Sequence, residues 1–124
     1  MNARLALTLA AALLFAAVGL GAFGAHALRE RLAPEMAAVY QTAVQYHFWH
    51  ALGLLAIGVL LTQRPASGLL AAAAWLIVAG IVLFCGSLYA LALTGIRGLG
   101  AVTPFGGVAF LAGWAVLAWA ASRS

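Results

Sequence analysis

Four long stretches without a single charged residue decide what this chain can fold into. They cover residues 5–28, 36–63, 65–96 and 98–122, and single arginines or one short polar segment separate them. Each stretch exceeds the roughly 20 residues that a helix needs to cross a hydrocarbon core of about 30 Å. The sequence therefore predicts an all-α, polytopic membrane protein. We expect four transmembrane helices in a bundle, with a short amphipathic stretch before the second span.

The composition agrees with a membrane domain. Of the 124 residues, 67% are hydrophobic and only 6% are charged, which lies far outside the usual range of soluble domains. The net charge of +4 comes from arginines scattered at the ends of the apolar stretches, so it does not indicate a nucleic-acid surface. We expect one membrane domain over residues 1–124, with spans at about residues 5–27, 44–63, 69–93 and 104–121.

Several local signals predict where helices begin. Pro34 followed by Glu35 suits the first turn of a helix, where a missing N–H is harmless and a carboxylate meets the positive dipole end. Ser67 is a candidate N-cap, and Thr103 followed by Pro104 predicts a hydroxyl cap with proline at the first helical position. The uncharged stretch after Glu35 exceeds one crossing, so we expect its first two turns to lie in the headgroup zone.

Small residues mark the faces that we expect other helices to approach. Gly21 and Gly24 lie in the second half of the first span, and Gly106 and Gly107 lie near the start of the fourth. Without a side chain, glycine lets two helix backbones come close, which is how helices associate where lipid is as apolar as leucine. We interpret these four glycines as packing positions.

The arginines predict orientation only weakly. Arg4, Arg64 and Arg123 share one side of the membrane in the four-span topology, whereas Arg29, Arg31 and Arg97 share the other. The α-amino group adds to the first side, which favours both termini in the cytoplasm. The N-terminal stretch ending in "AHA" also imitates a signal peptide, but its apolar run is longer than a usual signal core.

The stretch "QYHFWH" places two histidines in an otherwise apolar segment. His47 and His50 lie on one helix face, next to Tyr46, and we expect them to be shallow because the span enters near residue 44. His26 and Glu30 come from the same side of the membrane, so these groups are the candidate ligand-binding residues. Imidazole suits zinc, copper or haem, and a lipid head group or small organic ligand is another occupant. We favour histidines that serve in packing and hydrogen bonding, with no cofactor and with any metal unknown.

The spans lack the usual residues of membrane chemistry. No Asp, Glu, Lys or Arg lies within them, whereas proton pumps and ion-coupled transporters place such groups there. The sequence also has no phosphate-binding loop, no paired carboxylates and no nucleophile beside a base. We therefore expect a protein that is not an enzyme. Cys85, the one cysteine, is expected to be a small buried apolar residue.

Three blocks of the sequence resemble a known family. They are "GAFGAHAL" at residues 21–28, "YQTAVQYHFWHALGLL" at residues 40–55 and "GSLYALALTGIRGLGAVTPFGGVAFLAGW" at residues 86–114. Together they resemble domain of unknown function 423, also called uncharacterised protein family 0382, whose animal relatives are called transmembrane protein 256. The resemblance implies a four-helix membrane fold and residence in the bacterial inner membrane, but no substrate. It also implies that His26, His47 and His50 belong to the family's motif blocks.

These observations favour a small integral membrane protein of unknown biochemical activity. We expect a structural or accessory component that packs against lipid or a partner membrane protein, or that forms a homo-oligomer, with no nucleic acid among its partners. A histidine-based metal or haem binder at the membrane interface and a small oligomeric transporter or channel are the alternatives.

Overall fold

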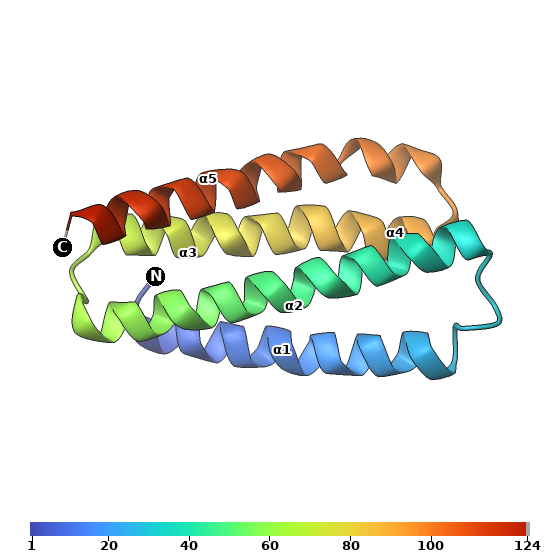
Figure 1. The fold of residues 1–124 in the computed structure, drawn as a ribbon, viewed down its shortest axis with the longest axis horizontal. Coiled ribbons are helices and arrows are strands. Elements are labelled where there is room, and N and C mark those ends of the chain that lie inside the picture. The colour runs from blue at the N-terminus through green and yellow to red at the C-terminus, as the bar shows by residue number, and fades with distance from the viewer. Residues whose placement is uncertain (124) are drawn as a thin grey trace.

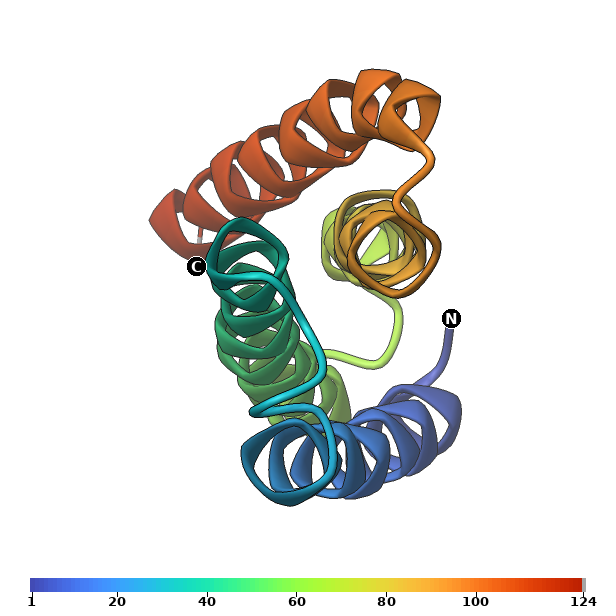
Figure 2. The same ribbon diagram turned by 90° about the vertical axis from the view of Figure 1, so that its right-hand side faces the viewer.

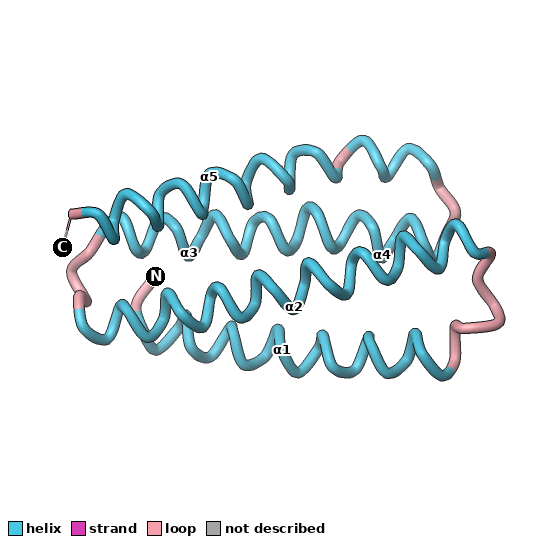
Figure 3. Tube along the Cα trace, viewed as in Figure 1, coloured by secondary structure: helices cyan, strands magenta, loops and turns pink. Residues whose placement is uncertain are grey.

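The computed structural model describes residues 1–123, and within that range the chain is helical apart from short connections (Figures 1 and 3). Four helical segments, Ala3–His26, Pro34–Gln63, Gly68–Thr94 and Arg97–Ser122, are long and apolar enough to cross a membrane. The all-α fold with four spans is thus confirmed. The elements are α1 (Ala3–His26), α2 (Pro34–Gln63), α3 (Gly68–Gly80), the π-helix η1 (Ile81–Cys85), α4 (Gly86–Thr94), the 3-10 helix η2 (Arg97–Ala101) and α5 (Thr103–Ser122).

Helix α2 lies at the centre of the bundle. It packs against α1 on one side and against α3, η1 and α4 on the other, while α5 packs mainly against α3 and η1. In consequence α1 and α5 lie on opposite sides of the molecule (Figures 1 and 2). The start of α1 and the end of α5 lie at the same end of the bundle (Figure 1). Short connections join antiparallel neighbours, as expected for such a bundle.

The distribution of side chains is that of a protein embedded in lipid. The buried residues of α1 are all alanines, and those of α5 are glycine or alanine apart from Phe110. Large apolar side chains point outward instead: Phe15 is 84% exposed, Phe105 71% and Leu111 72%. A soluble protein rarely exposes so much contiguous apolar surface. The buried residues of the two outer helices are Ala6, Ala10, Ala17, Gly106, Phe110, Gly113 and Ala120.

The glycines singled out from the sequence contact other helices to different degrees. A methyl group at Gly24 would collide with the Tyr40 ring of α2, and one at Gly106 would collide with the Phe84 backbone of η1. At Gly21 and Gly107 the added methyl would meet its nearest neighbours at 3.5 and 3.9 Å, which is ordinary contact. At four further glycines, which were not predicted as packing positions, an added methyl group would collide with a side chain of another helix. These pairs are Gly53 with Trp114, Gly58 with Leu7, Gly80 with Phe110 and Gly113 with Ile77.

Two predicted caps have different outcomes. Ser67 caps α3 as predicted, because its Oγ accepts a hydrogen bond from the Leu70 amide at 3.2 Å. The predicted Thr103 cap is wrong, since its hydroxyl lies 2.6 Å from Ser87 Oγ on α4 and no side chain caps α5. The 3-10 turn before α5 removes the need for a cap, because the Val102 carbonyl accepts from the Phe105 amide.

The second helix begins at Pro34, as predicted. It continues without interruption to Gln63, a length of 30 residues or about 45 Å at 1.5 Å per residue. His47 lies 13 residues beyond Pro34, roughly 20 Å along the axis. The two histidines are therefore buried in the bundle near the middle of α2, while their shallow position in the membrane stays a prediction.

Adjacent glycines at the start of α5 provide a matched test of this packing. We expect Gly106→Ala to lower the free energy of unfolding by about 1 to 3 kcal/mol, because backbone atoms of Phe84 must move. Gly107→Ala should be neutral or stabilise by up to about 1 kcal/mol, since alanine is the better helix former. Unfolding by SDS titration in mixed micelles measures both; equal effects would contradict this account of the α5 contact.

Candidate functional site

His47 joins three helices in the interior. Its side chain is only 4% exposed, and its Nδ1 lies 2.9 Å from the Tyr89 hydroxyl of α4. The other ring nitrogen, Nε2, is buried and has no hydrogen-bond partner within residues 1–123, although the backbone of Leu13 on α1 lies close to the imidazole. His47 thus lies where α1, α2 and α4 meet.

Two tyrosines complete this junction. The Tyr89 ring packs edge-on against Tyr40, with ring centroids 5.4 Å apart. The Tyr40 hydroxyl in turn donates a hydrogen bond to the Leu20 carbonyl of α1. These polar contacts connect α4 to α2 and α2 to α1. The His47 side of α2 is therefore a packed structural contact that leaves little room for a ligand.

His50 makes only a local hydrogen bond. Its Nδ1 lies 2.8 Å from the carbonyl oxygen of Tyr46, one turn earlier in α2. Because a carbonyl can only accept, Nδ1 must carry the proton, and Nε2 of the neutral ring then bears an acceptor lone pair. The imidazole stacks on Phe110 of α5 at 3.5 Å between ring centroids and lies parallel to Tyr46 at 5.8 Å.

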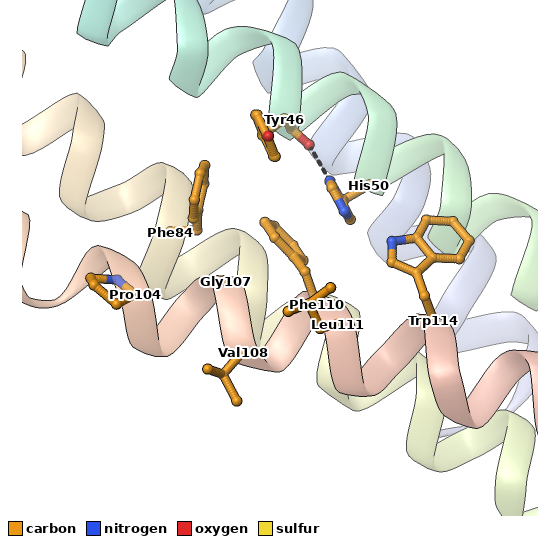
Figure 4. Close-up of a pocket in the computed structure, with 9 residues that line it drawn as sticks. All are labelled: Tyr46, His50, Phe84, Pro104, Gly107, Val108, Phe110, Leu111 and Trp114. Atoms are coloured by element: carbon orange, nitrogen blue, oxygen red, sulfur yellow. Dashed lines mark hydrogen bonds between the residues drawn. The ribbon is translucent and has the colours of Figure 1, made fainter.

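A pocket of about 390 Å³ lies beside His50, between α2, η1 and α5. Aromatic rings from three elements surround it, as Figure 4 shows, and the lining contains no charged residue. Two lining residues of α5 are largely exposed on the outer surface, Val108 at 64% and Leu111 at 72%. The lining is formed by Tyr46, His50, Phe84, Pro104, Gly107, Val108, Phe110, Leu111 and Trp114.

The histidines expected to converge do not do so. His26 ends α1 and is exposed, and with Glu30 it lines a separate surface hollow of about 510 Å³ near the α1–α2 connection. His47 and His50 instead lie near the middle of α2 and are buried inside the bundle. Within residues 1–123, no three side chains of His, Cys, Asp or Glu gather as metal ligands. Cys85 is buried as expected, at 1% exposure.

The sequence reading missed the aromatic partners of the two histidines. No site role was predicted for Phe84, Tyr89, Phe110 or Trp114. One signal was present: Tyr46 and His50 are four residues apart, as are Phe110 and Trp114, and such pairs share a helix face. Nothing in the sequence shows that these two faces meet.

Comparisons with known proteins agree on a family. Residues 20–107 match the family described as "Protein of unknown function (DUF423)". The UPF0382 membrane protein YwdK of Bacillus subtilis (strain 168) is 50% identical over 107 residues, which cover 86% of this chain and 87% of that protein. The UPF0382 membrane protein SH2409 of Staphylococcus haemolyticus is 50% identical over 81% of this chain and 80% of its own. No solved structure matches the chain.

The His47 junction gives a second prediction. We expect Tyr89→Phe to lower the free energy of unfolding by about 0.6 to 1.7 kcal/mol, because His47 Nδ1 loses its partner. Tyr46→Phe is the control, since no hydrogen bond of its hydroxyl is present in the described part of the chain. SDS titration of both variants measures the difference. A loss as large in Tyr46→Phe would mean that the His47–Tyr89 bond contributes nothing specific.

Proposed function

We propose, given that this chain belongs to the DUF423 family of membrane proteins of unknown function, that it is a non-enzymatic accessory component of the bacterial cell membrane. In this role the bundle is surrounded by lipid, and a helix of a partner membrane protein packs against the outer face of α1. The observation that carries the proposal is an unfilled hollow around Gly19 on that face.

Gly19 has no packing role inside the bundle. A methyl group added there would meet nothing within 4 Å, whereas glycines such as Gly24 and Gly106 are required by close neighbours. The surrounding surface of α1 forms a hollow of about 440 Å³ lined by Ala11, Leu14, Phe15, Val18 and Gly19. Small residues of this kind allow another helix backbone to approach closely in a membrane.

The position of α1 supports the same proposal. It is an outer helix whose main neighbour is α2, so most of its circumference stays uncovered. Phe15, at 84% exposure, stands beside the hollow as a large side chain that a docking helix would cover. Aromatic side chains, phenylalanine among them, are enriched at protein interfaces relative to the rest of the surface.

A cysteine cross-linking experiment tests the partner. Cys85 is buried at 1% exposure, so Gly19→Cys introduces one accessible thiol. We expect a bismaleimide to join Gly19→Cys to a different membrane protein in native membranes, and mass spectrometry identifies the product. Val82→Cys, on the 63% exposed surface of η1, is the control and should give no such product.

Two outcomes of this experiment oppose the proposal. If Gly19→Cys reacts with a monofunctional maleimide in native membranes but forms no cross-linked product, the α1 face contacts only lipid. A cross-linked product of twice the chain's mass would show that the helix packed against α1 belongs to a second copy of this chain and not to a different protein.

We also propose that both termini face the cytoplasm. The two ends of the chain lie at one end of the bundle (Figure 1), where Arg64 of the α2–α3 connection donates to the Ala120 carbonyl of α5 at 3.0 Å. A fluorescent reporter fused to the C terminus should be active, since it folds in the cytoplasm, and a periplasmic phosphatase fusion should be inactive. The reverse pair of results would place the termini outside.

A further inference from the structure

We propose that the pocket beside His50 binds an uncharged aromatic alcohol dissolved in the bilayer, of the phenol or hydroquinone class. The ligand's hydroxyl donates a hydrogen bond to His50 Nε2, and its ring lies among the aromatic side chains of the pocket. This inference is independent of the partner protein proposed for α1.

The position of the proton on the His50 ring favours a ligand that donates a hydrogen bond. The Tyr46 carbonyl holds the proton on Nδ1, so the neutral ring offers only an acceptor at Nε2. No protein group within residues 1–123 bonds this nitrogen, although the residue is only 6% exposed. Figure 4 shows the second nitrogen on the side of the ring away from Tyr46, toward Phe110 and Trp114. His47 also has an unbonded Nε2, but that atom is buried at a packed junction, whereas His50 lines the pocket. An ionisable residue inside a span is a candidate for function.

The walls of the pocket select a flat, uncharged ring. Tyr46 lies 4.5 Å from Phe84 between ring centroids, and Phe84 lies 5.5 Å from Phe110. The ring centroids of Trp114 and His50 lie 5.7 Å apart. The wall rings thus pack on one another, and the faces and edges that they leave toward the pocket can attract a ligand ring through offset and edge contacts. With no charged residue in the lining, a charged ligand would lose its hydration without compensation.

The location of the pocket selects a ligand that arrives through lipid. Val108 and Leu111 border it and are exposed on the outer face of α5, within a segment apolar enough to span the membrane. The volume of about 390 Å³ lies near the lower end of the 300–1,000 Å³ typical of ligand pockets. One substituted ring with a short chain fits this range.

The His50 pocket is less suited to coordinating a metal ion. Zinc and copper sites need three or four ligands, and no three such side chains gather in the described chain. An oxygen–hydrogen donor needs only the single acceptor that His50 provides. The pocket therefore favours an alcohol over a metal.

The direct test compares two probes that differ by one hydrogen-bond donor. In 4-pentylphenol the hydroxyl can donate, whereas in 4-pentylanisole a methyl ether on the same ring cannot. We expect the full-length protein in nanodiscs to bind the phenol about three- to tenfold more tightly, the usual effect of one hydrogen bond. Calorimetric titration against empty nanodiscs corrects for partition into lipid. Equal affinities would overturn the proposal and leave an apolar groove that an acyl chain fills.

Two variants test whether His50 Nε2 accepts the hydrogen bond from the ligand's hydroxyl. His50→Phe keeps a flat ring for stacking on Phe110 but removes the acceptor, so its preference for the phenol should disappear. His26→Phe makes the same change at an exposed histidine outside the pocket lining and should retain the preference within about twofold. If His50→Phe binds the phenol as tightly as the unmodified chain does, the proposal is wrong.

A spectroscopic readout keeps the test valid if His50→Phe does not fold. In protein carrying ¹⁵N-labelled histidine, 4-pentylphenol should shift the Nε2 resonance of His50 and leave that of His47 unchanged, while 4-pentylanisole should shift neither. A shift of His47 alone would overturn the assignment. So would a haem absorption band in the purified protein that His50→Phe abolishes, because a cofactor would then occupy the pocket.

Discussion

The absence of water in the bilayer core is the constraint on which the rest of the structure depends. Backbone groups there must be satisfied within each helix, and apolar burial does little to hold helices together because lipid is equally apolar. Close packing has to supply the cohesion. This explains why alanines and glycines face inward while Phe15 and Phe105 face outward, and why Gly106 lies directly on the backbone of Phe84.

The π-helical turn η1 shows how a local irregularity positions the pocket. The π-turn Ile81–Cys85 separates α3 from α4 within one continuous helical segment. Its Phe84 contacts Gly106 through the backbone and lines the pocket beside His50 with its side chain. A π-turn adds a residue and changes which side chains share a face on either side of it, and such turns are frequent at functional sites. Beyond it, Ser87 and Tyr89 reach Thr103 and His47 on different helices.

The fold followed from the sequence more readily than the site did. Uncharged stretches longer than a membrane crossing leave few alternatives to four helices, and Ser67 acts within its own turn, so a local pattern sufficed. The Thr103 cap failed because the hydroxyl found Ser87 on another helix. Likewise, the partner of His47 lies 42 residues away, and no spacing within α2 encodes that contact. The place of both histidines near the middle of one helix follows from α2 continuing unbroken from Pro34 to Gln63.

The two histidines of "QYHFWH" show how neighbouring residues of one type take different roles. A three-residue spacing turns both rings into the bundle, but at slightly different angles, so they meet different helices. His47 reaches Tyr89 through Nδ1 and joins α2 to α4, while its Nε2 is buried at this packed junction with no hydrogen-bond partner in residues 1–123. His50 bonds its own helix through Nδ1, so Nε2 stays available where α2 and α5 are held apart by aromatic rings rather than small residues. The close packing that stabilises the rest of the bundle is thus looser beside His50, where the pocket lies.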